Sequence, residues 1–348
     1  MGIFSKLSYK LFETGYMPDK ITKAWMYFLY FRALRKASLN NIEAKASVAR
    51  QIHNDMITGA KFQNRGYTER QSVELSPDFY EYFMGKRHSF SCANFPTGAE
   101  DLDEAEDTAL WLASDRARIR ENLDILEIGC GMGAMTFWLA EKFPSCRFTS
   151  LTDSQKNVSV LMKIAEDKKL DNITFISKEI NDLGSEAKFD RIICMERFDI
   201  LSGLGVWEKK IKSLLKPNGY FFLQTPVHSH SAYYSESVEL SDLPGNKVIE
   251  DIIMPSAQSF MHTNKALHLE DTWVISGEHY KKTADKWLRK FTFNKQPIYK
   301  TLEKTYGPKE ASSWYVRWRL YLISLVTRYS YNHGQEWIVG QYLYSANS

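Results

Sequence analysis

Apolar runs and amphipathic stretches alternate through the middle of the chain. Segments with the length and pattern of strands occur at 124–128, 147–152, 173–177, 189–195 and 219–224. The stretches between them have helical periodicity, so residues 123–226 are predicted to form parallel strands joined by right-handed helical crossovers. A period-two pattern at 336–344 predicts one more strand near the end of the chain. The fold class that follows is α/β.

The segments on either side of this core have other patterns. Residues 1–122 have mostly helical periodicity, and we expect them to form an N-terminal cover and a lid over a bound cofactor. Residues 227–300 are rich in His, Ser and aromatic residues, and their mixed pattern predicts an insertion that covers the substrate. Residues 301–348 predict a helix and the final strand that completes the core.

One stretch of the N-terminal segment is both aromatic and basic. Within residues 17–36, Trp25, Phe28 and Phe31 recur near helical spacing, and lysines and arginines surround them. A basic amphipathic helix of this kind packs against its own protein or lies on a membrane surface. The pattern leaves both interpretations open.

A glycine-rich stretch follows the first predicted strand. The seven residues from Glu127 onward are Glu-Ile-Gly-Cys-Gly-Met-Gly, and a helical pattern begins at Ala134. Glycines adopt positive φ and let a ligand approach the backbone, while a helix N-terminus offers free N–H groups. A strand, a glycine turn and a helix in this order therefore predict a site for the polar part of a nucleotide-like cofactor.

Two cofactor classes and a bland alternative fit this turn. The spelling acid-x-Gly-x-Gly-x-Gly, with Glu127 at the strand end, favours S-adenosylmethionine (SAM). Gly129, Gly131 and Ala134 also satisfy a loose dinucleotide pattern, and Asp153 follows at about the expected 20 residues. The third interpretation is a tight turn without a cofactor. Parallel strands end at one edge of a sheet, so the residues at the ends of the other strands should line up beside the turn. These are Thr152, Asp153, Glu179, Met195 and Glu196.

Composition excludes several classes of protein. The 348 residues carry 45 basic and 42 acidic side chains, a balance that argues against a nucleic-acid-binding protein. The four cysteines show neither a C-x-x-C pair nor a metal-ligand spacing, which favours a reducing, cytoplasmic compartment and no metal. We expect no signal peptide, because the first residues lack a long apolar core. We expect no transmembrane helix either, since the most apolar stretch, 314–330, is interrupted by arginines.

Several short motifs resemble those of one known family, and they occur in its order. They are Phe90-Ser91-Cys92-Ala93, the glycine turn, Leu151-Thr152-Asp153-Ser154, Met195-Glu196-Arg197-Phe198-Asp199, Trp273-x-x-Ser276-Gly277-x-His279-Tyr280 and Tyr331-Asn332-His333-Gly334-Gln335-Glu336-Trp337. The chain thereby resembles the cyclopropane-fatty-acid-synthase superfamily of SAM-dependent methyltransferases, and most closely its plant alkaloid N-methyltransferases of the coclaurine type. The likeness runs from about residue 10 to the end. It implies a Rossmann-like class I core with a mostly parallel, seven-stranded sheet.

The resemblance also implies a set of SAM-binding residues. They are Phe90 and Ser91 over the methionine end, Gly129 and Gly131 along the backbone, Thr152 and Asn157 near the ribose, Glu179 and Ile180 beside the adenine, and Met195 after the fourth strand. Other roles stay open for some of them. Thr152 and Asn157 also suit a helix cap, and Glu179 also suits a solvated loop.

The reacting end departs from the family pattern. Alkaloid N-methyltransferases carry Glu-x-Phe-Glu-His after the fourth strand, whereas this chain has Glu196, Asp199 and Ile200 at the acid and histidine positions. The presumed histidine base is therefore replaced. Glu196 and Asp199 remain as the candidate catalytic residues, able to attract a cationic amine and accept its proton, although a carboxylate also stabilises the ammonium form. Asp199 alternatively caps a helix.

The resemblance places further residues in a substrate pocket. They are Cys92, Trp273, His279 and Tyr280. Packing is the alternative role for Cys92, His279 and Tyr280. The lipid-modifying branch of the family builds a bicarbonate site from Cys, Glu, His and Tyr. The corresponding positions here are Cys92, Asp199, Gln224 and Tyr280, so two of the four residue types are kept and cyclopropanation is disfavoured.

The prediction is a SAM-dependent methyltransferase that methylates a small, partly aromatic amine at nitrogen. One alternative is a lipid-modifying methyltransferase that acts on an unsaturated acyl chain. Another is a SAM-binding protein without activity. We expect a small-molecule amine as partner and no nucleic acid, with peripheral membrane contact through residues 17–36 and a homodimer as options.

Overall fold

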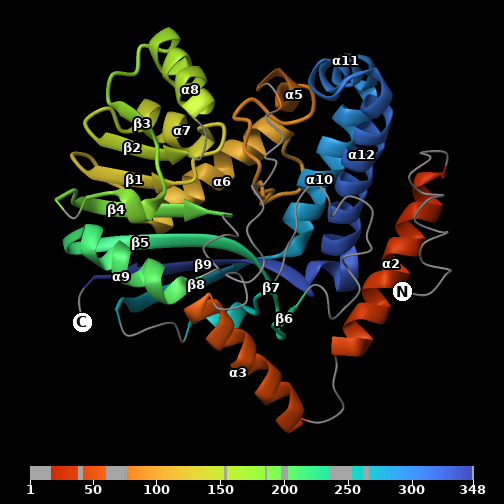
Figure 1. The fold of residues 1–348 in the computed structure, drawn as a ribbon, viewed down its shortest axis with the longest axis horizontal. Helices are drawn as coiled ribbons and strands as arrows, with labels where there is room; N and C mark the ends of the chain where they lie inside the picture. Colours follow the sequence, from red (N-terminus) through yellow and green to blue (C-terminus); the bar gives the residue numbers. More distant parts are fainter. Residues whose placement is uncertain are drawn as a thin grey trace.

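The computed structural model describes residues 17–37, 42–59, 75, 77–152, 155–184, 186–196, 203–234, 253–261 and 266–346. Its centre is a seven-stranded sheet with strand order β3-β2-β1-β4-β5-β9-β8 (Figure 1). The strands are β1 (Asp124–Ile128), β2 (Arg147–Thr152), β3 (Ile173–Ser177), β4 (Phe189–Met195), β5 (Leu215–His228), β8 (His268–Ile275) and β9 (Trp337–Ser345). Strands β1 to β5 pair in parallel, and β9 is antiparallel to both of its neighbours. The predicted α/β class with a mostly parallel, seven-stranded sheet is confirmed.

Helices cover both faces of this sheet, which explains why its strands are apolar on both sides. One face is covered by α6 (Leu102–Arg116), α7 (Ala134–Lys142) and α8 (Gln155–Asp167). The other face is covered by α9 (Leu204–Leu214) and α3 (Ile42–Thr58). Side chains alternate between the two layers along each strand, so Phe222 packs on the α6 side and Phe221 on the α9 side.

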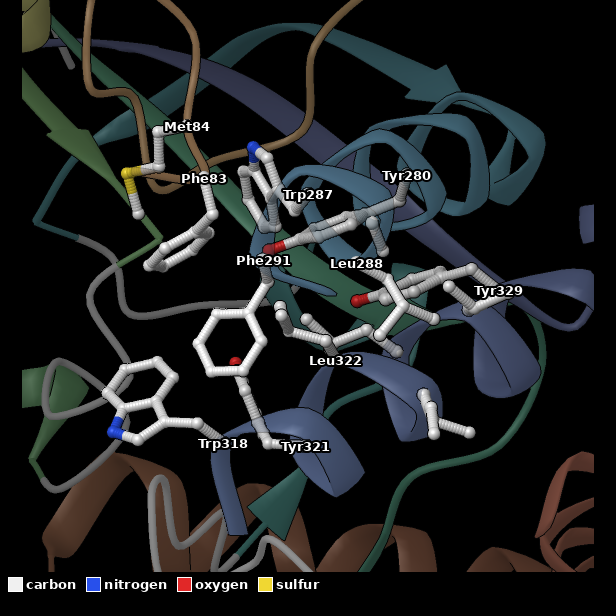
Figure 2. Close-up of a cluster of buried hydrophobic side chains, with 14 of the residues drawn as sticks. Phe83, Met84, Tyr280, Trp287, Leu288, Phe291, Trp318, Tyr321, Leu322 and Tyr329 are labelled. Carbon is white, nitrogen blue, oxygen red and sulfur yellow. The ribbon is translucent and has the colours of Figure 1, made fainter. Parts of the chain in front are cut away.

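A helical cover stands beside the end of the sheet where the parallel strands finish (Figure 1). It consists of α2 (Asp19–Ala37), the short α5 (Pro77–Glu81), α10 (Gly277–Phe293), α11 (Lys295–Tyr306) and α12 (Pro308–Ser330). Its core is aromatic: the Phe83 ring lies 5.6 Å from Phe291 and 6.1 Å from Trp318, centroid to centroid (Figure 2). Burying each such ring contributes about 1.5–3 kcal/mol.

Helix α2 packs against the protein with one face and exposes another. Met26 and Tyr30 are fully buried, and the Tyr30 hydroxyl donates to the Ser324 carbonyl of α12 at 3.3 Å. On the outer face, Ile21, Phe28 and Phe31 are 50%, 53% and 41% exposed. Across the described ranges, no helix combines the length and apolarity that crossing a membrane requires.

Strand β8 lies inside the segment that the sequence predicts as an insertion. Residues 268–275 pair with β9 at the edge of the core sheet, so part of 227–300 belongs to the core. The physical reason for the difference is that β8 is a half-exposed edge strand with charged side chains, whose pattern lacks the apolar run of a buried strand. Two small strands, β6 (Tyr233–Tyr234) and β7 (Ile253–Met254), form a separate pair within the same segment.

Candidate active site

The glycine turn between β1 and α7 has the backbone shape that the sequence predicts. Gly129 and Gly131 have φ values of 77° and 54°, in the left-handed region that favours glycine. The Gly129 and Cys130 N–H groups donate to the Leu151 carbonyl at 3.0 and 2.9 Å, which ties the turn to the end of β2. The turn therefore lies at the carboxyl edge of the sheet, where α/β proteins bind their ligands.

The open side of the turn is at Gly131. A Cβ atom placed on Gly131 would meet no heavy atom within 4 Å, whereas one placed on Gly133 would lie 2.6 Å from the Phe137 ring. Gly133 is thus a packing position, and Gly131 borders free space. Next to it, α7 begins with a glycine N-cap that offers no side-chain cap, and the Thr136 N–H of its first turn donates to Glu127. The N–H groups of Ala134 and Met135, which precede it, face the N-terminal end where a polar ligand group can bind. This geometry fits a nucleotide-like cofactor.

Glu127, at the end of β1, is hydrogen-bonded to helix α7. Its carboxylate accepts a hydrogen bond from the Thr136 hydroxyl, which lies 2.7 Å from the Ser150 hydroxyl on β2. Burial raises the pKa of Glu127 to about 7. The acid that the cofactor motif requires is therefore enclosed and close to its titration point at neutral pH.

The other predicted cofactor residues follow the ends of neighbouring strands. Ile128 at the end of β1 is in register with Leu151 on β2 and Cys194 on β4. The residues expected beside the cofactor lie just beyond that register. Thr152 is buried at the end of β2, Asn157 is half-buried on α8, Glu179 is exposed before the 3-10 turn at Ile180–Asp182, Ile180 is buried, and Met195 ends β4 half-buried. Asp153 lies outside the described residues, and the cofactor contacts of this set remain predictions.

Glu196 is the chemical centre of this edge. It has a φ of 54°, unusual for a residue other than glycine, and its N–H donates to the Gln224 carbonyl at 2.7 Å. This left-handed backbone turns the chain as it leaves β4. The carboxylate accepts hydrogen bonds from several elements at once. The donors are Ser91 Oγ at 2.5 Å, Cys92 N at 3.0 Å, Tyr280 Oη at 2.8 Å and Gln224 Nε2 at 3.2 Å.

Burial and hydrogen bonding act on the Glu196 carboxyl in opposite directions. Burial raises its pKa, while the hydrogen bonds from Ser91, Cys92 and Tyr280 lower it, and the net pKa lies above the ordinary carboxyl value. Burial and the nearby Glu196 charge also raise the pKa values of the Cys92 thiol and the Tyr280 hydroxyl. Both groups are therefore neutral near pH 7, and the site is one carboxylate held by neutral donors.

Tyr280 is held in place by stacking. Its ring lies 4.2 Å from the Tyr329 ring with only 2° between their planes, so α10 and α12 share this contact (Figure 2). The segment before α6 also packs against α10. The Phe90 ring stacks on Trp287 at 5.3 Å, and the Ala93 N–H donates to Thr283 Oγ1 at 3.1 Å. The predicted lid and the predicted pocket residue therefore meet at Glu196.

Two predicted pocket residues, His279 and Trp273, have their described contacts with groups other than Glu196. His279 accepts the Phe95 N–H on its Nδ1 at 3.0 Å, and burial lowers its pKa, so this neutral imidazole supports the lid segment. Trp273 lies on β8, where the Arg116 guanidinium is 5.2 Å from its ring centroid. Asp199 lies outside the described residues. Among those residues, no group of three or more His, Cys, Asp or Glu side chains is placed to hold a metal ion.

Two polar residues next to the site were not identified from the sequence. Gln341 interrupts the apolar strand β9 and donates to Gln224 Oε1 at 2.5 Å, and Arg116 of α6 donates to Gln341 Oε1. A buried amide in an otherwise apolar strand is a signal that the sequence carries, because such groups require partners. Nothing in the sequence marks Arg116, whose role depends on where α6 lies.

Comparison with known proteins places this geometry in context. A model of the mycolic acid cyclopropane synthetase family matches residues 63–334. The chain is 27% identical to (S)-coclaurine N-methyltransferase of Thalictrum flavum subsp. glaucum over 344 residues, which cover 96% of this chain and 94% of that protein. The crystal structure of a coclaurine N-methyltransferase bound to N-methylheliamine and S-adenosylhomocysteine superposes with a TM-score of 0.85 at 23% identity, covering 97% of both chains. The cyclopropane synthase MmaA2 of Mycobacterium tuberculosis gives a TM-score of 0.65 at 18% identity, over 78% of this chain and 95% of that one.

Proposed function

The chain belongs to the mycolic acid cyclopropane synthetase family of SAM-dependent methyltransferases, and on that premise we propose that it methylates the nitrogen of a small, partly aromatic amine. Membership of this family makes the chain an enzyme that transfers a methyl group from SAM. The choice of acceptor is our own inference. It rests chiefly on the enclosed Glu196 carboxylate at the carboxyl edge of the sheet.

The chain's own residues suit the cofactor. When bound, SAM supplies the methyl group, carried on its sulfonium. The free space beside Gly131 and the N-terminus of α7 would hold its polar end, and residues 90 and 91 of the lid segment would close over it. Ser91 donates a hydrogen bond to Glu196, so the lid segment also helps to position the carboxylate.

The acceptor nitrogen must lose its proton before it can attack. An alkylamine is mostly protonated at pH 7, so a carboxylate attracts it into the site. Methyl transfer then needs the free lone pair, and a carboxyl whose pKa is raised by burial is a better proton acceptor than an ordinary one. Glu196 would therefore bind the ammonium form and accept its proton, while proximity to the methyl donor supplies a large part of the rate.

Two further observations support an amine acceptor. The relative at 27% identity over nearly the whole chain is by name an N-methyltransferase. In addition, the buried Gln224 amide stands where the resemblance to the lipid-modifying branch expects a histidine, and its Nε2 donates to Glu196. The carboxylate and its donors therefore form a preorganised polar site suited to a cationic group.

A lipid acceptor is the second candidate, and one observation favours it. The outer face of α2 exposes Ile21, Phe28 and Phe31, and Arg32 and Arg35 lie beside the two aromatic rings at 5.9 and 5.6 Å. Exposed aromatic side chains flanked by arginines suit an anionic membrane surface. Such contact would bring the enzyme to acyl chains, which the family name associates with some of its members.

One experiment separates the candidates. The protein is incubated with methyl-labelled SAM and, in parallel, with a panel of aromatic and aliphatic amines and with phospholipid vesicles containing unsaturated acyl chains. Label in an N-methyl product, located by mass spectrometry, supports the amine assignment. Label recovered only in acyl chains supports the lipid assignment, and saturable SAM binding without transfer to any acceptor would favour a binding protein.

A further inference from the structure

We propose that a directional relay of hydrogen bonds across the sheet positions Glu196 for its reaction. The relay consists of Arg116 on α6, Gln341 on β9 and Gln224 on β5. These are positioning residues, since they act through Glu196. The inference rests on the proposed role of Glu196, but its test does not require a known acceptor.

The relay is built by strand register. Gln341 and Gln224 are directly opposite each other on the antiparallel strands β9 and β5, and Gln224 is in turn opposite Met195, which precedes Glu196. Both glutamines are at most 2% exposed. They point to the α6 side of the sheet, as Phe222 and Leu343 do two residues away, and Arg116 reaches them from α6.

The two ends of the relay determine its direction. An arginine side chain offers only donors, so Gln341 must present its oxygen to Arg116 and its NH₂ group to the next residue. Gln341 Nε2 donates to Gln224 Oε1 at 2.5 Å, which leaves the NH₂ group of Gln224 facing the site. There Gln224 Nε2 donates to Ser91 Oγ at 2.9 Å and to the Glu196 carboxylate at 3.2 Å. Each donor of the relay therefore points toward the Glu196 carboxylate.

This orientation favours the ionised form of Glu196. Buried amides without a fixed partner can turn, and a turned Gln224 would place an oxygen beside the carboxylate. Arg116 prevents this turn of Gln224 although it does not contact Gln224 directly. If both amides turned, the guanidinium would lose the Gln341 oxygen that accepts its hydrogen bond. Stacking of Arg116 on Trp273, which lies opposite Gln341 on β8, holds the guanidinium in place.

The titratable groups around Glu196 are neutral, so the relay is what favours its ionised form. Among the described residues in contact with the carboxylate, the titratable ones are Cys92 and Tyr280, and both are neutral near pH 7. From α12, Tyr321 and Tyr329 face Tyr280 and contribute to its raised pKa. Arg116 is the cation that the hydrogen-bond chain connects to the site.

The test is a double-mutant cycle measured against pH. Melting temperatures are compared for the parent, Arg116→Met, Glu196→Gln and the double variant between about pH 5 and about pH 8.5. The folded-state pKa of Glu196 is raised, so the stability of the protonated form is lost as pH rises through that pKa. Breaking the relay raises the pKa further. The gap between the parent and Arg116→Met should therefore widen with pH, by roughly 2–4 °C.

The Glu196→Gln background is the matched control, because the loss of stacking on Trp273 is the same in both backgrounds. There the gap caused by Arg116→Met should be constant with pH. Arg116→Lys keeps a charged donor and should restore much of the parent's pH dependence, and Gln341→Met breaks the relay at its middle and should repeat the effect. A gap that is independent of pH, or that widens equally with Gln at position 196, would overturn the relay. Neither result depends on methyl transfer, so failure of the relay and failure of the proposed function are distinguishable.

Discussion

The Tyr280 hydroxyl donates a 2.8 Å hydrogen bond to the Glu196 carboxylate and so joins the helical cover to the end of β4. These residues are 84 positions apart in the chain. Their contact means that the position of α10 affects the charge state of the group that we assign to the acceptor amine. Chemistry at the sheet edge thereby depends on the packing of the cover.

Tyr280→Phe should shift the pH dependence of turnover. Removing one donor to the ionised form raises the pKa of Glu196, so the part of the pH–rate profile that depends on ionisation of Glu196 should move to higher pH. Tyr342→Phe is the control, since its hydroxyl donates to the Ala257 carbonyl on the other side of the sheet. A profile for Tyr280→Phe that superposes on that of the parent would contradict the coupling.

Glu196→Gln should lower turnover by roughly 10² if the carboxylate accepts the proton of the amine. Affinity for SAM, measured by calorimetry, should stay close to that of the parent, because Glu196 is assigned to the acceptor. Glu166→Gln on the exposed side of α8 is a matched control with no expected effect. A loss of SAM affinity as large as the loss of turnover would make Glu196 a cofactor residue.

Gly131→Val should abolish SAM binding while the protein remains folded. The added side chain would enter the free space beside the turn and would strain a backbone with a φ of 54°. Gly307→Val is the matched control. Gly307 also has a positive φ, of 83°, and open space around its Cβ position, but it lies between α11 and α12. Both variants should lose stability, and only Gly131→Val should lose the ligand, as measured by calorimetry.

Glu127 and Glu106 should each make a contribution to the stability of the ligand-free protein that falls as pH rises from about 4.5 to about 7. Burial raises the pKa values of Glu127 and Glu106 to about 7, above the 4.5 that each has when unfolded. For a raised folded-state pKa, stability is fully present below the unfolded pKa and is lost as pH rises through the folded one. Glu127→Gln should remove part of this slope in denaturant titrations. An unchanged slope in that variant would show that Glu127 does not titrate in this range.

Changes on α2 test the membrane option independently of catalysis. If the outer face of α2 binds lipid, Phe28→Ser combined with Phe31→Ser should reduce sedimentation with vesicles that contain anionic phospholipid. Trp111→Ser serves as the control, because Trp111 is 58% exposed on α6. Equal sedimentation of all three proteins would remove the observation that favours a lipid acceptor.

Local patterns predicted the core of the fold from the sequence. Strands β1 to β4 occupy the predicted residues, because each is a short segment with apolar positions at strand spacing between two helical patterns. Strand β8 was not predicted as part of the core, since an exposed edge strand needs no apolar run.

The candidate site was predictable only in part. Glu196, Ser91 and Tyr280 were identified through motifs, but their convergence depends on the packing of α10 against the sheet edge. The link from Arg116 to Gln224 arises from strand register and helix position, which no local pattern encodes.

Methylation of an amine nitrogen with the help of Glu196 can be measured directly. The direct measurement is the initial rate of N-methyl product formation from methyl-labelled SAM, for the parent and Glu196→Gln, between about pH 6 and about pH 9.5. The account predicts labelled N-methylamine from the parent, a rate that rises with pH toward the pKa of the amine, and a deficit of roughly 10² in the variant. Parent and variant rates that coincide across this range, or label found solely on acyl carbon, would contradict it.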